Sequence, residues 1–188
     1  SYGLRNVQGL SFGPTGLLYA SEHGPSSDDE IDLIQAGKNY GWPHVAGFND
    51  DRGYVYAKWS ASAPAPCASL TFNNLNPPPS VPQARESSWQ HPDFAPPLAT
   101  LFTAPAGYDF AASGSTTIGP GSIEVYTSAA IPGWQASLLV TGMRTGALYR
   151  ATLGADGRTI VGAPLVYFRQ ADRYRDTAVA PDGRRLFV

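Results

Sequence analysis

The sequence predicts an all-β fold in which short strands are joined by tight turns, as in a β-propeller or a related radial β-fold. The chain has 188 residues with 20 Gly, 17 Pro and only 15% charged residues, which favours strands and turns over helices. A strand–turn–strand unit recurs along the chain, and no long amphipathic helix is evident. With 43% hydrophobic residues, the length allows one globular domain, 1–188, with a substantial core.

The repeated unit is clearest near the two ends of the chain. Residues 7–20 give a strand, a Gly-Pro-Thr-Gly turn and a second strand. The same pattern recurs at 177–188 around Pro-Asp-Gly, and a degenerate copy covers 148–161. Further strands are expected at 30–34, 96–102, 123–126, 137–141 and 147–151.

One segment interrupts this pattern. The stretch from 61 to 91 holds six prolines and has little periodicity. Because proline locks φ and removes a hydrogen-bond donor, we expect a loop excursion from the sheets at about 61–91. Cys67, the only cysteine, lies within it; it can form no disulfide inside this chain and is interpreted as a small apolar filler.

Charge and hydropathy exclude some classes of partner. The net charge of −2 gives no case for a nucleic-acid partner, which would normally require a basic patch. No apolar run approaches the length of a membrane span. The chain starts at Ser1 without Met or a signal peptide and stops at Val188 directly after a strand-like stretch, so we expect a fragment, a processed chain or a truncated one.

Polar residues concentrate in a loop between two strand-like segments, residues 21–30, which is rich in Gly, Pro and carboxylates and contains His23. Arg5 and Asn6 stand just before the preceding strand. Together they predict a site for an anionic ligand and a hard metal ion. Arg173 and Arg175 are separated by one residue and would share a face of a strand, which is costly unless an anion lies between them; a solvated strand edge is the alternative.

Five motifs in a fixed order carry a resemblance: 3–10, 21–25, 29–31, 39–43 and 173–176. With them the chain resembles the soluble, pyrroloquinoline-quinone (PQQ)-dependent glucose dehydrogenases and their aldose/sorbosone dehydrogenase relatives. The resemblance covers essentially all of this chain but only the C-terminal part of the family domain. It implies about half of a six-bladed β-propeller with four-stranded antiparallel blades, and oxidation of a sugar at C1 to the lactone with hydride transfer to PQQ.

The same resemblance implies the residues of the site. The cofactor would be bound by Arg5, Asn6, Thr117, Arg144, Arg173 and Arg175, with forked guanidinium groups on its carboxylates. Studied glucose dehydrogenases carry Lys in place of Arg144 and a longer loop at 108–117. One Ca²⁺ would bridge to the cofactor through the carbonyls of Gly24 and Pro25, and a second, structural Ca²⁺ would use the carbonyls of Ala46 and Phe48 with the carboxylates of Asp50 and Glu86.

The family's catalytic base is a His in the N-terminal half, so we assign no catalytic residue to this chain and expect it to be inactive alone. Because a half-propeller leaves open sheet edges, we expect a companion, either the missing N-terminal half or a second copy, with a homodimer as one possibility. The resemblance also implies a small aldose substrate and a periplasmic or secreted location.

Two other functions fit the residues. One is a non-catalytic extracellular β-propeller that serves as a binding module. The other is a calcium-dependent, lactonase-like propeller, which would require several carboxylates and Asn side chains converging on one metal in the channel.

Overall fold

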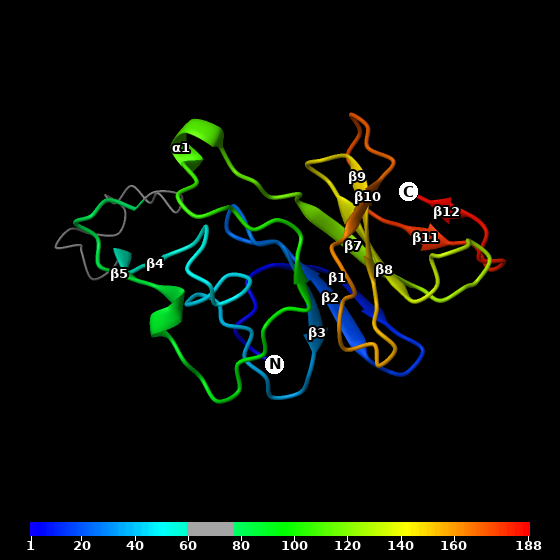
Figure 1. Cartoon of the computed structure of the whole chain (residues 1–188), viewed down its shortest axis with the longest axis horizontal. Helices are drawn as coiled ribbons and strands as arrows, with labels where there is room; N and C mark the ends of the chain where they lie inside the picture. Colours follow the sequence, from blue (N-terminus) through cyan, green and yellow to red (C-terminus); the bar gives the residue numbers. More distant parts are fainter. Residues whose placement is uncertain (60–76) are drawn as a thin grey trace.

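The computed structural model describes residues 1–59 and 77–188, and its main feature is a pair of four-stranded antiparallel sheets standing side by side (Figure 1). The first sheet has the spatial order β1-β2-β3-β6. It is built from β1 (Val7–Phe12), β2 (Leu18–Glu22), β3 (Glu30–Ile34) and β6 (Ala99–Thr100).

The second sheet repeats this plan with the spatial order β10-β9-β8-β7. Each sheet therefore begins at one edge and adds its next two strands by hairpins, as expected for consecutive blades. The second sheet consists of β7 (Pro120–Tyr126), β8 (Ser137–Gly142), β9 (Ala147–Thr152) and β10 (Leu165–Tyr167).

The main hydrophobic core lies between these two sheets. Because successive side chains of a strand point to opposite faces, each strand contributes every second residue to it. At the inner edge β1 packs against β7, and a side chain at Gly9 would have its Cβ only 2.6 Å from the amide nitrogen of Ile123. The buried residues of this core include Tyr19, Ile31, Leu33, Ile123, Leu138, Val140 and Tyr149.

A second core covers the other face of the second sheet. Tyr126, Leu139 and Leu148 pack there with partly buried neighbours that include Val179 and Leu186. These neighbours belong to β11 (Ala178–Val179) and β12 (Leu186–Phe187), an antiparallel pair that starts a third unit. The sheet in the middle is thus buried on both faces.

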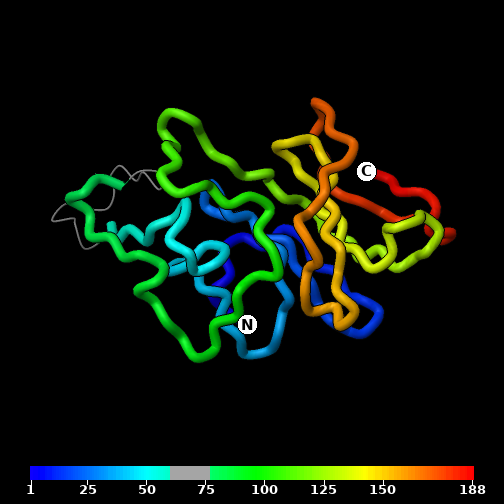
Figure 2. Tube along the Cα trace, in the orientation of Figure 1, coloured from blue at the N-terminus to red at the C-terminus, as the bar shows by residue number. Residues whose placement is uncertain are grey.

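The rest of the described chain forms a lobe of loops, which the cyan and green parts of the trace follow in Figure 2. It contains β4 (Tyr56–Ala57) paired with β5 (Gln83–Ala84), the short 3₁₀ helix η3 (Glu86–Ser88) and α1 (Phe110–Ser113). Residues 60–76, with Cys67 and the first half of the expected excursion, lie outside the described residues. Within the described ranges, no helix has the length and apolarity needed to cross a bilayer.

Most expected strands are present, but three are shorter or absent. The expected strand 96–102 is reduced to β6, and Ile160 forms only an isolated bridge with Leu153. The segment holding Arg173 and Arg175 is not a strand. Its backbone crosses to β7 instead: the Arg175 carbonyl accepts from the amide of Ser122 at 3.1 Å, where the β7–β8 pairing has an irregular register.

Candidate functional site

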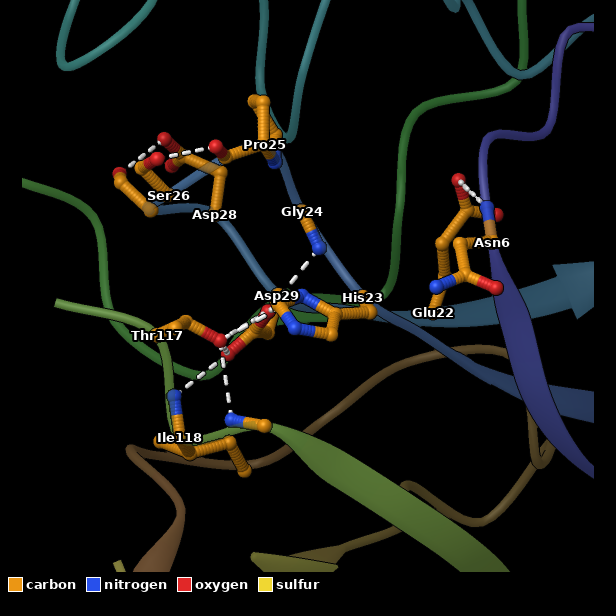
Figure 3. Close-up of polar contacts among 12 residues, drawn as sticks. Asn6, Glu22, His23, Gly24, Pro25, Ser26, Asp28, Asp29, Thr117 and Ile118 are labelled. Carbon is orange, nitrogen blue, oxygen red and sulfur yellow. Dashed lines mark hydrogen bonds and ion pairs between the residues drawn. The ribbon is translucent and has the colours of Figure 1, made fainter. Parts of the chain in front are cut away.

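The loop between β2 and β3 is organised around the buried carboxylate of Asp29 (Figure 3). Its Oδ1 accepts from the amide of Gly24 at 2.9 Å and lies 3.1 Å from Nδ1 of His23. Its Oδ2 accepts from the amide of Ile118 at 2.6 Å, and the Thr117 hydroxyl lies within 2.8 Å of both oxygens. One side chain therefore joins the first sheet's loop to the start of the second sheet.

The His23 ring is fixed by the same carboxylate. A carboxylate only accepts hydrogen bonds, so the facing Nδ1 of the imidazole carries the proton. The hydrogen bond from Asp29 raises the pKa of His23, and partial burial opposes this rise. His23 is thereby held as a wall of the site, with its Nδ1–H directed at Asp29; in the sequence it stands out only as part of the polar loop.

Arg5 and Asn6 are joined to this loop through the backbone. The amide of His23 donates to the Asn6 carbonyl at 3.0 Å, and Nη1 of Arg5 donates to the His23 carbonyl at 2.7 Å. The Arg5 amide donates to Oε1 of Glu22, and its guanidinium lies 5.3 Å from the centre of the Trp42 ring. Arg5 is thus held on three sides, and cation–π attraction contributes to this.

An open cavity of about 430 Å³ lies beside His23. Arg144 donates from Nη1 to the Ser115 carbonyl at 2.6 Å, and Nη1 of Arg175 lies 3.6 Å from Sδ of Met143. Among the residues that the structure describes, no acidic side chain lines this cavity, so its charged groups favour an anion. The residues that line it are His23, Thr117, Gly119, Met143, Arg144 and Arg173.

The Gly24–Pro25 bend is tight and rich in oxygen atoms. A Cβ at Gly24 would lie 2.0 Å from the Ser27 carbonyl oxygen and 2.6 Å from that of Asp28, so only glycine fits. The Pro25 carbonyl accepts from the Ser26 hydroxyl. The carbonyls of Gly24 and Pro25, the predicted ligands, belong to this bend, and neutral carbonyl oxygens are the kind of donor that a hard cation such as Ca²⁺ accepts.

The second expected metal site is brought together in part, with the Glu86 carboxylate at the backbone of Ala46 and close to the Asp50 carboxylate. Glu86 is fully buried and reaches back over more than 30 residues: its two oxygens accept from the amides of Ala46 at 2.9 Å and Asp51 at 3.0 Å. Burial raises the pKa of Glu86 to about 8, and the neighbouring Asp28 and Asp50 carboxylates add to this rise. A cation would relieve this concentration of negative charge, and the residues present fit one. In residues 1–59 and 77–188, no three His, Cys, Asp or Glu side chains form a metal cluster, so backbone oxygens would have to complete either site.

A separate acidic cluster lies on the other face of β2 and β3. Glu22 stands directly opposite Glu30, and Asp32 follows on the same face, all three buried. Burial, together with the neighbouring carboxylates, raises the pKa of Glu30 and Asp32 well above the ordinary values. Both oxygens of Asp32 and Oε2 of Glu22 are buried without a hydrogen-bond partner in the described structure.

The structure gathers most of the sequence-predicted residues into one region. Arg144, Arg173 and Thr117 line the cavity, Arg175 borders it through Met143, and Arg5 and Asn6 adjoin it through His23. The other histidines behave differently: His44 and His91 are half-buried and their rings stack on Trp89.

The sequence does not predict the central role of Asp29. It belongs to the motif 29–31, but one Asp among several in a polar loop carries no signal of its own. Its partners at Thr117 and Ile118 are almost 90 residues away, and only the packing of the second sheet on the first brings them together.

Comparison with known proteins identifies the family to which the chain belongs. The sequence profile of the glucose/sorbosone dehydrogenase family matches residues 1–75 and 103–188. The chain belongs to this family. Quinoprotein glucose dehydrogenase B of Acinetobacter calcoaceticus is 41% identical over 196 residues, which cover 99% of this chain and 41% of that protein.

Solved structures of family members show the same architecture. A crystal structure of glucose dehydrogenase matches 96% of this chain at a TM-score of 0.63 and 26% identity, covering 40% of its own chain. The PQQ-bound aldose sugar dehydrogenase of Streptomyces coelicolor matches 93% of this chain at a TM-score of 0.54 and 22% identity, covering 34% of that chain. The two sheets are therefore consecutive blades of part of a β-propeller. The chain spans between 34% and 41% of the length of these three relatives.

Proposed function

We propose that this chain is the part of a quinoprotein aldose dehydrogenase that holds PQQ and its calcium, in an enzyme that oxidises a sugar at C1 to the lactone. The observation that carries the proposal is the convergence of Arg144, Arg173 and His23 on one cavity without acidic side chains, next to the Gly24–Pro25 bend. Two residues of this cavity, Arg144 and Arg173, bear fixed positive charges suited to carboxylates. The family relationship supports the choice of ligand.

PQQ is a planar tricarboxylate whose ortho-quinone would supply the two-electron acceptor for sugar oxidation. The chain's own residues would bind and orient it. Arg144, Arg173 and Arg175 would pair with its carboxylates, while Thr117 and Asn6 would hydrogen-bond to its polar edge. Arg5 is fixed by the His23 carbonyl and the Trp42 ring, so it can present its remaining guanidinium donors with little loss of side-chain entropy.

Calcium would serve this site in two ways. The carbonyls of Gly24 and Pro25 would hold the ion that meets the cofactor, where a Lewis acid polarises the quinone oxygens. A second ion held by Ala46, Phe48, Asp50 and Glu86 would neutralise the buried Glu86 carboxylate and fix the loop lobe. Burial is the main cause of the raised pKa of Glu86, with Asp28 and Asp50 adding to it, and a cation would stabilise the charged form that burial disfavours.

We propose that the catalytic base and the sugar pocket come from a companion propeller segment, either the missing N-terminal half or a second copy. The chain together with that companion is called the assembled protein below. The coverage of only about two fifths of relatives supports this proposal. We further propose a periplasmic or secreted location, which the family resemblance alone supports.

The test is a titration of the assembled protein with PQQ in the presence of Ca²⁺, followed by the absorbance of the quinone. We expect saturable binding that Arg173→Ala weakens by at least tenfold and that chelation of Ca²⁺ reverses. Arg158→Ala, a change in the distant turn after β9, serves as the matched control and should leave binding unchanged. Absence of saturable binding would contradict the proposal and favour the alternative function of a non-catalytic binding module. Lactone hydrolysis without quinone would indicate the lactonase-like alternative.

A further inference from the structure

We propose that Asp29 is a positioning residue of this site, whose buried carboxylate locks the His23 ring, the Gly24–Pro25 bend and Thr117 into one unit. The proposal rests on the proposed function for its effect on quinone binding, but not for its effect on local geometry. No ligand contact is required of Asp29, because all its partners are groups of this chain.

Asp29 and the groups that donate hydrogen bonds to it, on Gly24, His23, Thr117 and Ile118, are called the hub below. The side chain is fully buried, and its two oxygens face different parts of the fold: Oδ1 serves Gly24 and His23 of the first sheet's loop, and Oδ2 serves Ile118 at the start of the second sheet. Backbone amides cannot give up their protons, so both sides require an acceptor. A carboxylate is the only side chain of this size that offers an acceptor on both sides.

Each partner of Asp29 borders the cavity or the metal bend. His23 and Thr117 line the cavity, and the Gly24 amide belongs to the residue whose carbonyl is proposed to meet the metal. The Thr117 hydroxyl also accepts from the amide of Gly119, another lining residue, at 2.9 Å. A shift of the Asp29 carboxylate would therefore move the cation-binding bend and the cavity wall together, and positioning of this kind decides how well a ligand is held.

The decisive variant is Asp29→Asn, which keeps the shape of the side chain but replaces one acceptor by a donor. Whichever way the amide turns, its NH₂ group faces the donors of one side and leaves them without an acceptor. Asp182→Asn, an exposed change in the turn before β12, is the matched control. Both variants are compared with the wild type in the assembled protein, labelled with ¹⁵N at His, Gly and Ile.

Two readouts are needed, and the first involves no quinone. In the wild type we expect the His23 ring in its Nδ1–H form and low-field amide resonances for Gly24 and Ile118. Asp29→Asn should displace at least one of these signals to the position of an unbonded group. The second readout is affinity for PQQ with Ca²⁺, expected to fall by about 10- to 100-fold. A purely structural role would lower thermal stability and leave the affinity of the folded protein unchanged.

Unaltered signals for all three residues, or affinity within twofold of the wild type in the folded variant, would overturn the proposal. If Asp29→Asn does not fold, Asp29→Glu, which keeps both acceptors but moves the carboxylate by one methylene group, is measured in the same way with the same criteria. If the wild type fails to bind PQQ, the proposed function is wrong, while the His23, Gly24 and Ile118 signals still decide whether Asp29 holds these groups.

Discussion

Asp29 immediately precedes β3 and Asp32 lies in the middle of that strand; both are buried, yet their surroundings are opposite. Asp29 receives backbone amides, a hydroxyl and an imidazole N–H. No backbone amide, hydroxyl or imidazole of the described structure donates to Asp32, whose neighbours are the carboxyl groups of Glu22 and Glu30. Burial alone therefore does not mark a binding site. Hydrogen-bond donors distinguish the two carboxylates, because donors fix the position of a buried carboxylate and offset the cost of its desolvation.

The largest effect is expected from Asp29→Ala. Removing the carboxylate leaves the amides of Gly24 and Ile118 buried without an acceptor, and each such loss costs about 1–3 kcal/mol. We expect the free energy of unfolding, measured by urea titration at pH 7, to fall by about 3 kcal/mol. A loss of less than about 0.5 kcal/mol would show that water or another acceptor replaces Asp29.

Asp32→Asn is expected to act in the opposite direction. The raised pKa values of Asp32 and Glu30 mean that the folded state holds protons that the unfolded state releases. The stability from these groups is therefore complete at low pH, below about 4, and is lost as the pH rises toward the raised values. At pH 8 the variant should exceed the wild type by on the order of 1 kcal/mol, and its stability should decline less between pH 4.5 and 8. If the free energy of unfolding changed equally with pH in the variant and the wild type, the contrast between Asp29 and Asp32 would be wrong.

Thr117→Val tests how much one hydroxyl donor contributes to holding the Asp29 carboxylate. It removes one donor from the carboxylate while the amides of Gly24 and Ile118 stay bonded, and the Gly119 amide, which loses its acceptor, borders the open cavity where water can replace it. The expected loss of stability is about 1 kcal/mol, in line with one net hydrogen bond. Thermal unfolding followed by circular dichroism can measure it; a loss as large as that of Asp29→Ala would place the main support of the hub at Thr117 instead.

Glu22→Gln is expected to give the smallest effect, on the side of Asp32. The amide oxygen can still accept from the backbone of Arg5, while the new NH₂ group takes the place of the unpartnered Oε2 and can donate to a neighbouring carboxylate. A gain of about 0.5 kcal/mol in the free energy of unfolding at pH 8 should follow. Destabilisation in the urea titration would indicate that the charge of Glu22 is needed to hold Arg5.

The two regions also differ in how far the sequence could predict them. Strand alternation and turn residues predicted β1 to β3 and β7 to β9, because these signals are local. The resemblance supplied the arginines and Thr117; of these, Arg144, Arg173 and Thr117 line one cavity, and Arg5 and Arg175 lie beside it. The hydrogen bonds to Asp29 depend on the packing of two sheets. The crowding of carboxylates around Asp32 depends on strand register. Neither leaves a local pattern, since Asp29 is one of several carboxylates in a polar loop and Asp32 stands between Ile31 and Leu33 in an ordinary alternating strand.

A crystal structure of the assembled protein with PQQ and Ca²⁺ would test the central claim most directly. We predict quinone density beside His23, with carboxylates on Arg144 and Arg173 and a cation on the carbonyls of Gly24 and Pro25. Quinone bound elsewhere, with that cavity filled only by solvent, would contradict the account.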